Sequence, residues 1–227
     1  MKRNYGIDLL RMVFVILLHL TGVGGICANA QLFSPQFFLS QFLRIGTFCA
    51  VNCYALISGF VGWNRTPKLS SLLRLWVKVM AFCVLITVMT QLRAPETVGL
   101  QDLWKAFTPV KEAKYWYFNA YVGLFFFIPL LNHAIRSISG REAVFAMVGI
   151  FLLVLWLPKT RLSEVFLLAN GYSALWLVIL YAMGGLMARF ELPGKLPAKL
   201  WALGYLLAIL CTVAFGYILN LAVFRPM

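Results

Sequence analysis

Long apolar stretches recur along the chain and are separated by short polar connections. A helix needs about 20 largely apolar residues to cross a bilayer. The candidate spans are 7–27, 42–62, 72–92, 115–135, 143–158, 168–188 and 200–221. Because backbone groups in lipid must find hydrogen-bond partners within their own segment, these spans are predicted to be helices. The pattern predicts an all-α, polytopic integral membrane protein with about seven transmembrane helices.

The composition supports a membrane protein. Of the 227 residues, 62% are hydrophobic and 12% are charged, whereas about 25% of the residues in a typical soluble domain are charged. The mean hydropathy is +0.86. Since the spans leave no room for a separate soluble domain, residues 1–227 are expected to form a single transmembrane domain.

The net charge of +13 fits either nucleic-acid binding or a membrane surface. In membrane proteins, Lys and Arg gather in cytoplasmic loops and beside anionic headgroups. We therefore expect membrane lipid, and no nucleic acid, as a partner. The cysteines lie in or beside apolar segments, with no His or acid at metal-ligand spacing, so neither a metal site nor a disulfide framework is predicted.

Basic residues predict the orientation in the membrane. They gather at the N-terminus and in the connections after the second, fourth and sixth spans, whereas the connection 28–41 has no Lys or Arg. This asymmetry places the N-terminus in the cytoplasm. The chain is expected to be a multi-pass protein of the inner or plasma membrane of the cell. The connection 93–114 is also basic but mixed in sign, and it is expected to lie along the outer surface as an amphipathic segment.

The first span carries three ionisable residues, Asp8, Arg11 and His19. A charge near the bilayer centre costs about 3 kcal/mol on insertion scales and by default marks function. At 100° per residue, the three fall within about 80° of one another around the helix, and His19 lies about 12 Å from Arg11 along the axis. This face is the first candidate for a functional site.

Two further clusters each have two interpretations. Ser58 precedes Gly59 late in the second span, where the pair suits either close helix packing or a polar cavity wall. Arg65, Lys68 and Arg74 follow that span. They fit ordinary cytoplasmic charge, or a binding site for a phosphorylated donor, because Lys and Arg pair well with phosphate oxygens.

The fourth span opens with the aromatic run 115–118 and Tyr121, and it contains Pro129. Aromatic residues at this place are typical of a lipid-interface anchor. The proline is expected to kink the helix and free a carbonyl, and a kinked helix with asparagines suits a cavity wall. The predicted cavity residues are Ser58, Trp116, Asn119 and Tyr121.

Taken together, these stretches resemble the membrane-bound acyltransferase family 3, the bacterial O-acyltransferases that modify surface polysaccharides and related glycans. The resemblance runs from residue 3 to about 192. The stretches that carry it are 3–11 (RNYGIDLLR), 56–60 (LISGF), 115–118 (YWYF) with Tyr121, 129–132 (PLLN), and 171–176 (GYSALW) with Tyr181.

The resemblance implies a reaction. An acyl group, usually acetyl, passes from cytoplasmic acyl-CoA to a hydroxyl of an extracytoplasmic glycan or lipid-linked saccharide, with acyl-CoA as co-substrate and no bound cofactor. The family is thought to use an Arg and a His that match Arg11 and His19 here. Neutral His19 suits a general base. Arg11 suits binding of the donor phosphates or of developing negative charge, and Asp8 suits an i, i+3 pair with Arg11.

Two departures from the family leave an alternative open. The interval from Arg11 to His19 is about one helical turn shorter than in the family, which rotates His19 by about 60° and shifts it by about 4.5 Å. The family also has more spans, so the chain is expected to be shortened at its C-terminus. The alternative is a truncated, catalytically inactive relative that acts as a glycan-lipid-binding membrane protein. A small transporter ranks below both, because no internal repeat is evident.

Overall fold

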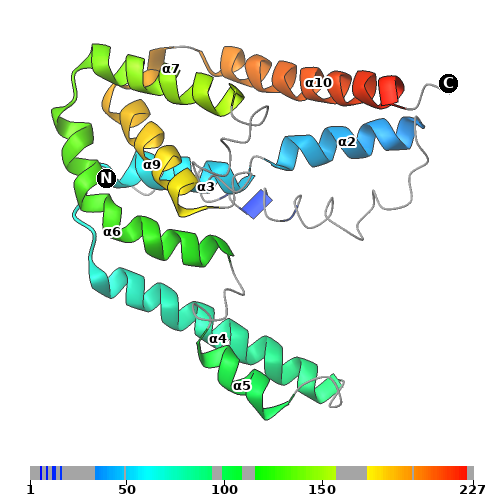
Figure 1. Cartoon of the computed structure of the whole chain (residues 1–227), viewed down its shortest axis with the longest axis vertical. Coiled ribbons are helices and arrows are strands. Elements are labelled where there is room, and N and C mark those ends of the chain that lie inside the picture. The colour runs from blue at the N-terminus through cyan, green and yellow to red at the C-terminus, as the bar shows by residue number, and fades with distance from the viewer. Residues whose placement is uncertain are drawn as a thin grey trace. The chain divides into compact units, whose positions relative to one another are not determined.

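The computed structural model describes residues 6, 9, 12, 13, 16, 34–48, 50–93, 99–108, 116–156, 173–195 and 197–223 (Figure 1). Within these residues the chain forms helices joined by short turns, and no strand occurs among them. The all-α prediction is confirmed. The elements are α2 (Pro35–Phe48), α3 (Ala50–Gly62), α4 (Leu69–Arg93), α5 (Leu100–Phe107), α6 (Trp116–Ser137), α7 (Gly140–Trp156), α9 (Ala174–Arg189), the 3₁₀ turn η4 (Leu192–Lys195) and α10 (Ala198–Val223).

Among the described residues, four helical runs are long and apolar enough to cross a membrane. They are Pro35–Gly62, Leu69–Arg93, Trp116–Ser137 and Ala198–Gly216. α7 and α9 are shorter, with 17 and 16 residues, and they coincide with the predicted spans 143–158 and 168–188. The first predicted span, 7–27, lies largely outside the described residues, so the count of seven stays a prediction.

One helix begins earlier than the apolar pattern predicted. α2 starts at Pro35, inside the stretch 28–41 that was expected to be a connection. The Phe37 N–H donates to the Ser34 hydroxyl oxygen at 3.1 Å. Serine is a favoured N-cap, and proline suits the first helical position because its missing N–H has no partner there anyway. This local capping extends the helix beyond the apolar run.

The chain divides into two compact units, Met1–Ala55 with Glu191–Met227, and Leu56–Phe190. In the first unit α2 packs on α10, where the Tyr205 hydroxyl donates to the Gly46 carbonyl oxygen. A Cβ at Gly46 would lie 3.3 Å from the Ile209 side chain, so the helices are close there. Near the N-terminus, the helical residues Leu9, Met12, Val13 and Ile16 form an exposed apolar stripe.

The second unit is built on a close crossing of α3 and α9. A Cβ added to Gly59 of α3 would lie 1.9 Å from the Tyr181 carbonyl oxygen, and one added to Gly184 of α9 would lie 2.0 Å from the Leu56 carbonyl oxygen. Real Cβ atoms are never found so near a carbonyl, so both positions admit only glycine without moving backbone. The close-packing interpretation of the Ser58–Gly59 pair agrees with this contact.

α6 packs along α9 in the same unit. A Cβ at Gly123 would lie 3.2 Å from the Ala174 side chain, and Leu124 and Leu177 are fully buried. α6 contains Pro129 and runs without a break from Trp116 to Ser137, and Figure 1 shows it bending along its length. The proline removes one intrahelical hydrogen bond, which accounts for a bend without ending the helix.

α7 begins with a capping box. The Ser139 N–H donates to the Glu142 carboxylate at 2.8 Å, and the Glu142 N–H donates to the Ser139 hydroxyl oxygen at 3.3 Å. This reciprocal pair supplies acceptors for two N–H groups that have none within the helix. The hydrogen bonds from the Ser139 backbone and side chain lower the pKa of Glu142 from its ordinary value of 4.5.

The lowered pKa of Glu142 predicts a pH-dependent contribution to stability. A carboxylate whose pKa is lower in the folded state stabilises the fold above its ordinary pKa, and this contribution is lost as pH falls through the lowered value. We expect Glu142→Ala to lower the melting temperature slightly at pH 7 and to match the parent at the most acidic pH that the folded protein tolerates. A difference that persists unchanged at acidic pH would contradict the role of the carboxylate.

Candidate functional site

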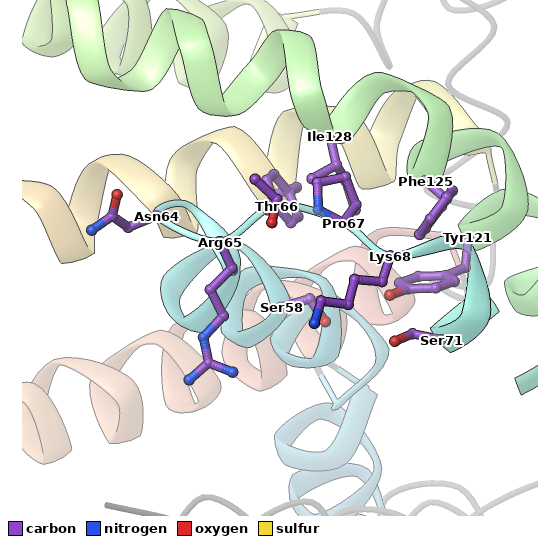
Figure 2. Close-up of a pocket in the computed structure, with 12 residues that line it drawn as sticks. Ser58, Asn64, Arg65, Thr66, Pro67, Lys68, Ser71, Tyr121, Phe125 and Ile128 are labelled. Carbon is purple, nitrogen blue, oxygen red and sulfur yellow. The ribbon is translucent and has the colours of Figure 1, made fainter. Parts of the chain in front are cut away.

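A cavity of about 690 Å³ lies at the connection between α3 and α4, within the unit Leu56–Phe190 (Figure 2). α6 and α9 complete its wall. It combines two cations, three hydroxyl-bearing residues of α3 and α4 and their connection, and two aromatic rings of α6. The lining residues are Ser58, Gly62, Asn64, Arg65, Thr66, Pro67, Lys68, Ser71, Tyr121, Phe125, Ile128 and Tyr181.

The backbone explains why the two cations lie on this connection. α3 ends at Gly62, and a tight turn follows in which the Arg65 N–H donates to the Gly62 carbonyl oxygen at 2.9 Å. Pro67 disfavours a helical conformation for the residue before it. α4 restarts directly after Lys68, whose carbonyl oxygen accepts from the Ser71 N–H at 2.8 Å. The N-terminus of α4 therefore opens at the cavity and adds positive potential to that of Arg65 and Lys68.

A buried hydrogen-bond cluster joins the turn to α6 and α9. Asn132 and Tyr181 are 1% and 2% exposed. The Asn132 amide nitrogen donates to the carbonyl oxygens of Gly62, at 3.1 Å, and Arg65, at 2.8 Å. Its amide oxygen accepts from the Tyr181 hydroxyl at 3.0 Å. All the main hydrogen-bonding groups of this side chain are thus used, and three stretches distant in sequence meet at one residue.

A second cluster closes the end of α6. Arg189, at the end of α9, donates from one guanidinium nitrogen to the carbonyl oxygens of Ile135 and Ile138, the latter at 2.6 Å. Its guanidinium also lies 5.0 Å from the ring centre of Phe190. The last carbonyls of a helix lack partners within it, so Arg189 acts as a C-terminal cap. The ends of α3, α6 and α9 therefore lie together.

Four of the predicted site residues line the cavity, namely Ser58, Arg65, Lys68 and Tyr121. Figure 2 shows Lys68 extending from the connection toward Ser58, whereas Arg65 extends from the same connection in a different direction. Arg74 is not a lining residue. Its guanidinium donates to the Ser70 carbonyl oxygen and to the Ser71 hydroxyl within α4. Arg74 thus contacts Ser71, which lines the cavity, from one helical turn further along.

Trp116 and Asn119, predicted as cavity residues, do not line this cavity. At 100° per residue, they lie about 140° and 200° around α6 from Tyr121, whereas Asn132 lies about 20° from it. The Trp116 ring packs edge-on against Tyr117, with ring centres 5.6 Å apart. The Asn119 amide oxygen is buried and has no hydrogen-bond partner. The spacing of eleven residues between Tyr121 and Asn132 puts both on one side of α6. This spacing is the sequence signal by which Asn132 could have been found.

Asp8, Arg11 and His19 lie outside the described residues, so their relation to the cavity stays a prediction. Among the residues that the structure describes, no group of three or more His, Cys, Asp or Glu side chains is placed to hold a metal ion. The cavity itself offers cations, hydroxyls and aromatic rings. Such a lining suits an anionic ligand with an apolar or ring-bearing portion.

Comparison with known families gives one result. A family model described as an acyltransferase domain matches residues 4–225 of the chain. The matched stretch includes every described helix from α2 to α10 and extends past the boundary near residue 192 at which the resemblance in sequence motifs ends. Comparisons with curated proteins and with solved structures found no match.

Proposed function

The chain belongs to the acyltransferase family 3, and on this premise we propose that it transfers an acyl group, usually acetyl, from acyl-CoA to a hydroxyl of an extracytoplasmic glycan or lipid-linked saccharide. The observation that carries the donor assignment is the cavity between α3 and α4. Acyl-CoA is a phosphorylated adenine nucleotide that is joined through a pantetheine chain to an acyl thioester. Arg65 and Lys68 suit its phosphates, and Tyr121 and Phe125 suit stacking or packing of its base and chain.

The grouping of three helix ends supports a cytoplasmic position for this cavity. α3, α6 and α9 end together, as the contacts of Asn132 and Arg189 require. The connections that leave these ends carry basic residues in or beside them, whereas the other basic connection, 93–114, is mixed in sign. Because basic connections stay in the cytoplasm, we place this end of the unit at the cytoplasmic face of the plasma membrane. Acyl-CoA is made and kept on that side.

The proposed chemistry uses the three ionisable residues of the first span. His19 accepts the proton of the acceptor hydroxyl while its oxygen attacks the thioester carbonyl. A bond forms between that oxygen and the acyl carbon, the carbon–sulfur bond breaks, and coenzyme A leaves as the thiol after taking the proton from His19. Arg11 stabilises the negative charge that develops on the carbonyl oxygen or holds a donor phosphate. Asp8 orients Arg11.

Binding of radiolabelled acetyl-CoA to the purified protein tests the donor site. We expect saturable binding by the parent and a weakening of about tenfold in each of Arg65→Ala and Lys68→Ala, because a charge-assisted hydrogen bond contributes about 1.5–3 kcal/mol. Arg141→Ala is the matched control, since Arg141 is also an exposed basic residue and lies in the first turn of α7, outside the cavity lining. If the parent fails to bind acetyl-CoA, or if all three variants bind alike, the donor assignment is wrong.

The short interval between Arg11 and His19 favours a second candidate function. A rotated His19 would leave a catalytically inactive relative that binds a lipid-linked glycan without acylating it. This candidate predicts glycan-lipid binding together with no transfer from labelled acetyl-CoA. Transfer of label to an added saccharide acceptor would exclude it.

A further inference from the structure

The turn between α3 and α4 receives little support from burial. Asn64, Arg65 and Thr66 are exposed, so packing of their side chains contributes little to the position of the backbone. The turn's own hydrogen bond, from the Arg65 N–H to the Gly62 carbonyl oxygen, fixes its local shape but not its place in the unit. Trp63 makes one contact with α9, where its Cβ lies 3.1 Å from the position of a Cβ on Gly185. A further group that bonds to the backbone of the turn would hold it against α6.

Asn132 supplies that group. Its amide nitrogen donates to the carbonyl oxygens at both ends of the turn, Gly62 and Arg65. The Gly62 carbonyl is among the last of α3, so no N–H group within the helix donates to it. Because Asn132 is almost fully buried on α6, water cannot readily replace it as donor.

Tyr181 fixes which way the Asn132 amide faces. Its hydroxyl donates to the amide oxygen, which leaves the two amide hydrogens directed at the turn. Tyr181 is itself held at the glycine crossing, where its carbonyl lies against Gly59 and its hydroxyl would be 2.8 Å from a Cβ at Gly62. The chain of contacts runs from the crossing of α3 and α9, through Tyr181 and Asn132, to the backbone of Arg65.

We propose that Asn132 is a positioning residue of the donor site. It holds the turn at residues 62–65 so that Arg65 and Lys68 face the cavity, and it thereby sets the affinity for the phosphorylated donor without touching the reacting atoms. The identity of that donor, acyl-CoA, rests on the proposed function. The claim that Asn132 holds the turn rests only on its hydrogen bonds to Gly62 and Arg65.

Asn132→Leu tests this role, because leucine is close in size to asparagine and donates no hydrogen bond. Tyr181→Phe is a milder second variant that removes only the hydroxyl donor. Arg189→Gln is the matched control, since it removes a cap from the end of α6 and leaves the turn at 62–65 in place. All are compared with the parent in the intact purified protein, by hydrogen exchange of amides 62–68, by acetyl-CoA binding, and by the split between kcat and KM for the donor.

We expect faster exchange within residues 62–68 and about tenfold weaker acetyl-CoA binding in Asn132→Leu, with smaller changes of the same sign in Tyr181→Phe. KM for the donor rises and kcat stays near that of the parent. Arg189→Gln lowers the melting temperature while donor binding and exchange at 62–68 stay as in the parent. If Asn132→Leu does not fold, the Tyr181→Phe comparison decides.

Unchanged exchange at 62–68 in both variants would overturn the proposal, as would exchange that rises equally throughout the protein. Faster exchange at the turn with unchanged donor affinity would also overturn it, because the turn would then not set the affinity. If the parent itself binds no acetyl-CoA, the proposed function fails, and the exchange comparison still shows whether Asn132 holds the turn.

Discussion

Gly184→Ala is expected to prevent α3 and α9 from packing as they do in the parent and to lower the melting temperature sharply. The added Cβ would lie 2.0 Å from the Leu56 carbonyl oxygen, and the obstructing atom belongs to backbone, which cannot rotate away. Overpacking of a well-packed core costs about 1–3 kcal/mol, and we expect the upper part of that range here. Gly59→Ala should behave alike, since its Cβ would meet the Tyr181 carbonyl.

Thermal unfolding of the purified protein in detergent measures this effect. Gly149→Ala is the matched control, because Gly149 lies on α7 with no atom within 4 Å of the added Cβ. The control should melt at the temperature of the parent or slightly above it, since alanine favours helix. If Gly184→Ala melts like the control, the helices do not approach as closely as the structure shows.

His19→Ala is expected to reduce acyl transfer by about 10²–10⁴-fold, the range for loss of a general base. Donor binding should stay within about twofold of the parent, because the cations proposed to hold the donor are unchanged. The assay measures transfer of labelled acetyl from acetyl-CoA to a saccharide acceptor, alongside donor binding by the same preparations.

The chain has two histidines, and the second provides the control. His133 is exposed on α6, so His133→Ala should retain both transfer and binding. Equal transfer by the parent and by His19→Ala would remove His19 from the proposed chemistry. A loss of transfer in both variants would point to a general effect of removing an imidazole.

Most of the helices were predictable because they are long apolar runs, and such a run in lipid has few alternatives to a helix. The short α5, which contains Asp102 and Lys105, is the exception. The early start of α2 was not predictable, since it depends on the Ser34 cap and on Pro35, which lie outside the apolar run. Which helix packs against which could not be predicted from the sequence either. Gly59 and Gly184 show where helices can approach closely, but two glycines do not say that they face each other.

Part of the site was predictable because its residues are close together in the sequence. Arg65, Lys68 and Ser58 are near one another in sequence, so their meeting at one cavity required only that α3 end and α4 begin there. Tyr121 came from an aromatic run. The run alone did not fix the rotation of α6, so Trp116 and Asn119 were grouped with it although they face elsewhere. The contacts of Asn132 were missed because they join residues about 70 positions apart.

The crossing of α3 and α9 also limits how the cavity can move. A glycine on each helix faces a carbonyl of the other, so sliding either helix by one residue would set a side chain against backbone. These two contacts oppose sliding of α3 along α9 within the unit. A swing of α4 or a change in the bend of α6, which form the other walls, would widen the cavity and leave the crossing as it is.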